Sequence, residues 1–182
     1  MPNYRRAFLP GGTFFFTVVT FQRRKLFERP EYRLVLRETI ERVRQKHPFF
    51  IDAWVLLPEH MHCIWTLPEG DSNYSGRWSM IKSGFSIRTK KNLHKPEWIN
   101  ASRQKHREST IWQRRFWEHL IRDDEDYRIH VDYIHYNPVK HELVKQVKNW
   151  PYSTFHRYVK KGIYSENWGN KAITALDYDI GE

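Results

Sequence analysis

The chain has 182 residues, a formal net charge of +10 and one cysteine, Cys63. This length suits one domain with a sizeable core, and the excess of Lys and Arg favours a polyanionic partner such as nucleic acid. A single cysteine excludes an internal disulfide framework and fits the reducing cytoplasm, where we expect the protein to act. No apolar run approaches the roughly 20 residues of a membrane span, so we expect no membrane association. The alternative is a basic protein that binds no anion specifically.

The first part of the chain predicts a strand, a helix and two more strands. Residues 30–48 place apolar side chains at helical spacing, with Pro30 in the first turn and Pro48 as the stop. Three β-branched or aromatic runs predict strands, the last two joined by a tight turn: residues 13–22, 49–57 and 60–67. The middle of these runs is continuous enough in apolar residues to indicate a central strand.

The second part is less regular. Trp78, Ile81 and Phe85 indicate a helix, which Gly84 should weaken. The following segments predict a basic surface loop, a strand and a capped helix: residues 86–115, 110–121 and 123–138. The acidic start of the last helix suits the helix dipole, and Pro138 should limit its end.

The predicted order is β-α-β-β-α-β-α. It indicates an α+β fold with a ferredoxin-like antiparallel sheet and helices on one face. His60 and His62 then lie on a central strand and Tyr133 on a C-terminal helix. We expect one main domain over residues 1–149, with residues 150–182 as a C-terminal extension packed on the same domain.

The stretch PEHMHCIW contains two histidines one residue apart. Because side chains alternate along a strand, His60 and His62 should point to one face and Met61 to the other. Two adjacent imidazoles suit a metal site, although such a pair is more often structural when taken alone.

The late helix offers partners for that pair. Asp126, His130, Tyr133 and Asn137 are spaced three or four residues apart and form one polar stripe. Two imidazoles and an amide oxygen suit Mg²⁺ or Mn²⁺, and a phenol nearby is a possible nucleophile. Its proton requires an acceptor, either water or a base such as His130.

These residues resemble those of a known family. His60-Met61-His62 resembles the HUH motif of single-strand DNA endonucleases, and YIHYNPVKHELV, residues 133–144, resembles the tyrosine motif of REP-associated tyrosine transposases. Residues 4–20 and 150–158 are also similar to this family. One departure is His141-Glu142-Leu143, where the family often has a glycine before the leucine, so the turn after the helix should differ.

The resemblance implies a specific reaction. Tyr133 would attack a phosphodiester of single-stranded DNA, keep the 5′ phosphate and release a 3′ hydroxyl, which can later reverse the step. His60, His62 and Asn137 would hold Mg²⁺ or Mn²⁺. The substrates would be single-stranded DNA hairpins of the repetitive extragenic palindromic (REP) type. Insertion-sequence relatives work as dimers, so a homodimer is possible here.

Several basic and aromatic residues are candidates for DNA contacts. The cationic candidates are Arg5, Arg6, Lys90, Lys91, Arg114 and Arg115, and the candidates for stacking on unpaired bases are Trp112 and Trp117. Two other functions are compatible with the same residues. One is a non-catalytic single-stranded nucleic-acid binder that uses the sheet as an aromatic platform, and the other is a zinc hydrolase with Glu59 as base.

Overall fold

The computed structural model describes residues 6–106 and 108–169. Its longer elements are β1 (Thr13–Val19), α1 (Pro30–Lys46), β2 (Phe50–Leu56), β3 (His60–Thr66), α2 (Tyr74–Leu93), β4 (Trp117–Leu120) and α4 (Asp124–Lys140). Two shorter helices are α3 (Ala101–Lys105) and α5 (Phe155–Lys160). The predicted α+β class is confirmed, and the helix predicted at Pro30 begins and ends as expected.

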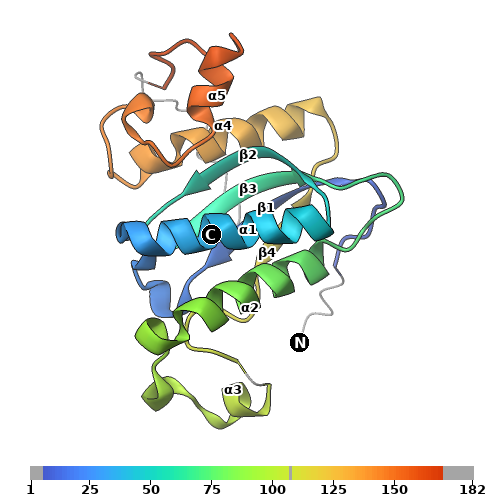
Figure 1. Ribbon diagram of the computed structural model, residues 1–182. Coiled ribbons are helices and arrows are strands. Elements are labelled where there is room, and N and C mark those ends of the chain that lie inside the picture. Colours follow the sequence, from blue (N-terminus) through green and yellow to red (C-terminus); the bar gives the residue numbers. More distant parts are fainter. Residues whose placement is uncertain (1–5, 107, 170–182) are drawn as a thin grey trace.

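The strands form one antiparallel sheet in the order β2-β3-β1-β4 (Figure 1). This order is that of a ferredoxin-like sheet, in which β1 and β3 are the inner strands. The pairing of β1 with β3 runs from Thr13 opposite Thr66 to Val19 opposite His60. The two histidines of β3 therefore lie at the end of the sheet where β1 ends.

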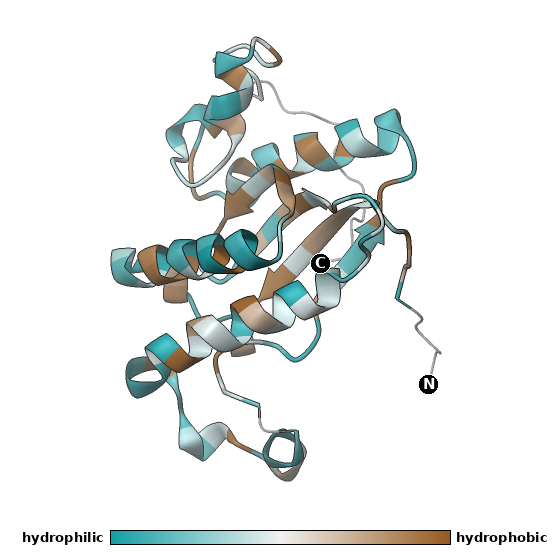
Figure 2. Cartoon of the chain, turned by 45° about the vertical axis from the view of Figure 1, so that its right-hand side comes forward, coloured by the Kyte–Doolittle hydropathy of each residue, from teal (hydrophilic) through white to brown (hydrophobic). Residues whose placement is uncertain are grey.

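Alternation along β1 separates two apolar layers. Phe14, Phe16 and Val18 join the larger cluster, which also contains side chains of α1 and α2. Phe15 points to the opposite face, where it packs with Val131 and other side chains of α4. Figure 2 shows the resulting arrangement, with apolar strands in the middle and hydrophilic residues on the outer sides of the helices.

The expectation of helices on one face holds only for α1 and α2. The seventh element, α4, covers the other face over β2 and β3 (Figure 1). The reason is that both faces of the inner strands are apolar, since Phe15 and Ile64 face away from α1 and α2 and require their own cover.

Two segments differ from their predicted form. The helix α2 continues to Leu93, although the sequence indicated a surface loop from residue 86, and β4 is confined to Trp117–Leu120. The helix persists because Phe85, Thr89 and Leu93 are buried at helical spacing. Gly84 lies where α2 passes α1, and a Cβ there would come 3.0 Å from the Thr39 methyl group.

The prediction that residues 49–57 form a central strand is wrong, because β2 lies at the edge of the sheet. The strand is nevertheless apolar because residues 150–169 contact its free edge and α4 covers one of its faces. Ser153 pairs with Val55, and Thr154 exchanges hydrogen bonds with the backbone of Trp54. Tyr158 of α5 joins the apolar cluster beneath α4. Within the described ranges, no helix combines the length and apolarity of a membrane span.

Candidate active site

His60 and His62 lie side by side on β3. Their ring centroids are 4.9 Å apart, and both rings are buried on the α4 side of the sheet, while Met61 belongs to the opposite cluster. This is the arrangement that strand alternation predicts. The two imidazoles therefore face the helix that carries Tyr133.

One nitrogen of each imidazole is held by a neighbouring side chain. His60 Nδ1 lies 2.9 Å from Glu59 Oε1, and His62 Nδ1 lies 2.9 Å from Thr17 Oγ1. The hydrogen bond to His60 lowers the pKa of Glu59, which favours the ionised carboxylate as the acceptor of a hydrogen bond from Nδ1–H. In the neutral tautomer that donates Nδ1–H to Glu59, Nε2 of His60 has the lone pair that a metal ligand requires. Burial lowers the pKa of His62 well below its usual range, which keeps this ring neutral.

The helix α4 brings Tyr133 to the histidine pair. Asp123 caps the helix by accepting a hydrogen bond from the Asp126 backbone N–H at 2.8 Å. Tyr133 is 1% exposed, and its ring centroid lies 5.2 Å from that of His62. Lys140 Nζ lies 4.8 Å from the centre of the same phenol ring. The phenol ring therefore has both an imidazole and a cation as neighbours.

Asn137 is one helical turn beyond Tyr133 on α4. The residue is fully buried, and neither its amide oxygen nor its amide nitrogen has a hydrogen-bond partner among the described residues. The same holds for His60 Nε2. Buried polar atoms without partners are costly, so these atoms fit a site that is completed by a ligand. Two imidazole nitrogens and an amide oxygen suit a divalent cation such as Mn²⁺.

His141 also lies beside the histidine pair, although it was not among the site residues predicted from the sequence. Its ring centroid lies 5.2 Å from that of His60. The spacing was available in the sequence, because His141 follows Asn137 by four residues and so continues the stripe of Asp126, His130 and Tyr133.

His130 takes part in a second cluster. His130 Nδ1 lies 2.8 Å from the Asp126 backbone oxygen and 3.1 Å from Asp126 Oδ1. His119 Nε2 of β4 lies 2.8 Å from Asp126 Oδ2, and burial lowers the pKa of His130. The ligand atoms of these three residues lie within 4.8 Å of one another and could hold a metal ion. The role of His130 as proton acceptor for Tyr133 stays a prediction.

The predicted DNA contacts do not form one surface. Arg6, Lys90 and Arg114 line a common groove beside α2, whereas Lys91 and Arg115 are exposed outside its lining. Arg5 lies outside the described residues.

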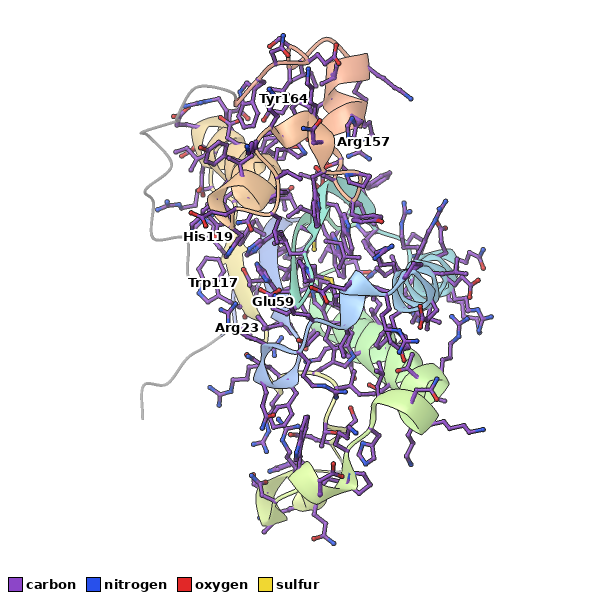
Figure 3. All side chains as sticks on the ribbon, turned by 90° about the vertical axis from the view of Figure 1, so that its left-hand side faces the viewer. Arg23, Glu59, Trp117, His119, Arg157 and Tyr164 are labelled. Atoms are coloured by element: carbon purple, nitrogen blue, oxygen red, sulfur yellow. The ribbon has the colours of Figure 1, made fainter. Side chains whose placement is uncertain are left out.

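The two tryptophans differ in exposure. Trp112 is 4% exposed and packs between Phe27 and Phe85, so the prediction that it stacks on unpaired bases is wrong for this conformation. Trp117 is half-buried and projects from β4 beside His119, with the two rings nearly parallel (Figure 3).

Comparison with known proteins identifies the family. The chain is 49% identical to the REP-associated tyrosine transposase of Escherichia coli K12 over 182 residues, which is 100% of this chain and 98% of that protein. It belongs to the REP-associated tyrosine transposases. A relative of the same family name from Haemophilus influenzae is 47% identical over 180 residues, covering 99% of this chain and all of the relative. No family model matches the chain.

A solved structure of a REP-associated tyrosine transposase supports the same assignment. That protein was determined bound to a REP hairpin, and it matches 92% of this chain and 91% of its own at 49% identity and a TM-score of 0.78. The expected family is therefore confirmed. Membership in the REP-associated tyrosine transposases makes this chain an enzyme that cleaves and rejoins DNA.

Proposed function

We propose that this transposase cleaves single-stranded DNA at REP-type hairpins through a 5′-phosphotyrosine intermediate. The Tyr133 oxygen attacks the phosphorus, the bond from phosphorus to the 3′ oxygen breaks, and that oxygen leaves as a hydroxyl. The phosphoester energy is kept in the new bond, so a 3′ hydroxyl can reverse the step and join strands. The observation that carries this proposal is the Tyr133 ring beside His62, with the unpartnered amide of Asn137 one turn away.

The same residues suit a cation, for which Mg²⁺ and Mn²⁺ are the candidates. His60, His62 and Asn137 would supply the ligands. Once bound, a divalent cation polarises the phosphate and neutralises charge in the transition state. Glu59 and Thr17 would orient the two rings through their Nδ1 atoms. This use of Glu59 argues against a zinc hydrolase, because a carboxylate bonded to a ligand is turned away from the substrate side.

Tyr133 requires an environment that favours its phenolate, because a free phenol has a pKa near 10. The Lys140 ammonium over the ring supplies positive charge. The proton would go to water or to an imidazole, with His130 and His141 as the two candidates on α4. Action on the DNA of the cell would place the enzyme in the cytoplasm.

A denaturing gel tests the proposed chemistry. The protein is incubated with a labelled hairpin oligonucleotide that carries a single-stranded flank, with Mn²⁺, with Mg²⁺ or with a chelator. We expect a covalent adduct with either ion and none with the chelator. Tyr133→Phe should abolish the adduct, whereas Tyr136→Phe, a half-buried tyrosine of the same helix, should retain it.

Three results would contradict the proposal. Cleavage without an adduct would indicate a hydrolase, and binding without cleavage would indicate a non-catalytic DNA binder. An adduct in Tyr133→Phe would show that a residue other than Tyr133 is the nucleophile. The binder is also disfavoured by the fold, because helices on both faces leave little of the sheet as an aromatic platform.

A binding experiment locates the cation. Calorimetric titration with Mn²⁺ should lose its signal in His60→Ala and keep it in His119→Ala. The opposite result would assign the cation to the cluster of His119, Asp126 and His130.

A further inference from the structure

The turn that follows β1 contains two consecutive residues in a conformation that favours glycine. Gln22 has a φ of +56° and Arg23 a φ of +48°, both in the left-handed region. Strained backbone of this kind persists only where the surrounding structure holds it, and it occurs often at functional sites. The side chains of this turn are therefore candidates for a role in the reaction.

The turn is fixed to the segment that leads into the histidine pair. The Thr20 N–H donates to the Glu59 backbone oxygen at 2.9 Å. The Thr20 hydroxyl lies 2.9 Å from the same oxygen and 2.8 Å from the Arg24 backbone oxygen. The Arg23 N–H in turn donates to the Thr20 oxygen at 3.1 Å. Since Thr20 is fully buried and His60 directly follows Glu59, these bonds hold Arg23 in place relative to His60.

The Arg23 side chain reaches the edge of the candidate active site. Its Nη1 lies 3.9 Å from Glu59 Oε1, and this oxygen lies 2.9 Å from His60 Nδ1. Figure 3 shows the side chains of Arg23 and Glu59 next to each other. Burial lowers the pKa of His62, and the charge of Arg23 is among those that lower it further. The guanidinium is therefore close enough to act on charge at the histidine pair.

The ion pair with Glu59 leaves the hydrogen-bond donors of the guanidinium available. A separation of 3.9 Å is too long for a hydrogen bond, and the Arg23 side chain is 49% exposed, so this pair contributes little to stability. Among the described residues, no oxygen accepts a hydrogen bond from the Arg23 side chain. An arginine offers five N–H donors in a planar fork that matches the oxygens of a phosphate.

We propose that Arg23 is a further catalytic residue, which donates hydrogen bonds to the non-bridging oxygens of the phosphate that Tyr133 attacks. The proposal rests on the proposed function, because it adds a contact to the same phosphate. As the bond from the phenol oxygen to phosphorus forms and the bond to the 3′ oxygen breaks, a fixed positive charge beside the non-bridging oxygens stabilises the transition state. Arg23 stays protonated throughout, and the 3′ oxygen takes its proton from water.

The rate of adduct formation tests this role. The rate is measured with Mn²⁺ and a saturating concentration of the hairpin oligonucleotide with its single-stranded flank. Arg23→Gln removes the charge and keeps a polar side chain, so we expect the rate to fall by about a hundredfold. The control is Arg42→Gln, which makes the same change at an exposed position of α1 and should retain the native rate.

A modified substrate shows whether Arg23 touches the reacting phosphate. A methylphosphonate at the cleaved position has a methyl group in place of one non-bridging oxygen and carries no charge. If Arg23 binds that oxygen, the ratio of the native rate to the Arg23→Gln rate should fall to less than about threefold in at least one of the two diastereomers. A ratio that stays near a hundredfold in both diastereomers would overturn the proposal.

Two binding measurements separate this role from a structural one. In a Tyr133→Phe background, which cannot react, Arg23→Gln should change the Kd for the hairpin by less than about threefold. The Mn²⁺ affinity from calorimetric titration should change as little. A loss of Mn²⁺ affinity as large as the loss of rate would mean that Arg23 acts through Glu59 and His60. An equally large rise in Kd would make it a general DNA contact, and either result would overturn the proposal.

The strained turn supplies a matched pair of variants. Gln22→Gly and Arg23→Gly both place a glycine at positive φ, where it suits the backbone, so both should fold. We expect Arg23→Gly to lose adduct formation as Arg23→Gln does and Gln22→Gly to retain it. Equal losses in the two glycine variants would show that the turn, not the guanidinium, is responsible.

The proposed chemistry and the proposed role of Arg23 fail in different ways. If the native protein forms no adduct, the tyrosine chemistry is wrong and the role of Arg23 is wrong with it. If the native protein forms the adduct and Arg23→Gln forms it at the same rate, the role of Arg23 is wrong and the chemistry stands.

Discussion

Glu142 shows how one residue sets the exit from the helix that carries the tyrosine. Its φ is +56°, in the left-handed region that favours glycine. The Leu143 N–H donates to the Pro138 oxygen and the Glu142 N–H to the Val139 oxygen, both at 2.9 Å, which is a Schellman motif. The glycine that the family often has near this position matches this conformation, and glutamate here is strained.

Glu142→Gly should therefore stabilise the protein. The substitution removes the steric cost of a Cβ at positive φ, so we expect the free energy of unfolding to rise by about 0.5–1 kcal/mol. Urea denaturation at neutral pH measures it. Glu142→Ala is the control, since it removes the carboxylate and keeps the Cβ, and it should bring no such gain. Equal gains in both variants would show that charge, not backbone strain, is responsible.

Glu59 makes a second prediction for a single residue. If its carboxylate orients His60 for a cation, Glu59→Gln should lower Mn²⁺ affinity by about 10–100-fold. The neutral amide keeps the shape of the side chain but polarises the Nδ1–H less. Calorimetric titration of Mn²⁺ measures the change, with Glu28→Gln as an exposed control. An unchanged affinity would remove Glu59 from the proposed site.

The sequence predicted those site residues that depend on local periodicity. Alternation on a strand placed His60 with His62, and helical spacing placed Tyr133 one turn from Asn137. Trp112 was misjudged because its burial depends on rings from α2 and the segment before α1, which are distant in sequence. Packing between residues that are distant in sequence cannot be predicted from a local sequence pattern.

At the scale of elements, the order of the strands and helices could be predicted because their sequence patterns are strong. Runs of β-branched and aromatic residues gave the strands, and α1 has a clear apolar stripe. The basic second half of α2 predicts a loop, although Phe85, Thr89 and Leu93 keep the helical spacing. Lys90 and Lys91 favour a loop when the local sequence is considered alone, but their charges lie on the solvent side of the helix and do not interrupt the buried stripe.

The contact between α4 and the C-terminal segment contains a buried imidazole, His135, from which we predict sensitivity to acid. His135 is fully buried, its Nε2 lies 2.8 Å from Thr154 Oγ1, and its ring packs against Tyr158. Burial lowers the pKa of His135 to about 3. The unfolded chain binds a proton near pH 6.5 and the folded chain does not, so this imidazole costs stability as the pH falls from about 6.5 toward 3.

His135→Gln should reduce this acid sensitivity. From pH 7 to pH 5, one such imidazole removes about 2 kcal/mol from the free energy of unfolding, so the loss in the variant should be smaller by about that amount. The variant starts from lower stability, because glutamine packs less well among the rings. Urea denaturation at both pH values measures the difference. Parallel losses in the two proteins would show that His135 is not the titrating group.

At the scale of the whole molecule, the sheet separates two surfaces that carry different residues. The face under α4 holds Tyr133 and the histidine pair, and the face under α1 and α2 holds the serine- and cation-lined groove. The strand β4 is an edge strand between them. The net charge of +10 predicts an anionic partner. The net charge does not say where the cationic side chains lie, because their positions on the surface depend on the fold.

This division predicts the salt dependence of binding. If the hairpin neutralises about six of the cations, its affinity should fall about a thousandfold between 50 and 200 mM salt, with a logarithmic slope near −5. Lys90→Glu should reduce the size of the slope by about one, because one phosphate contact is lost. Tyr133→Phe should leave the slope unchanged, since it removes a nucleophile and no charge. Anisotropy titrations at several salt concentrations measure all three, and a slope that is the same in Lys90→Glu would mean that this lysine touches no phosphate.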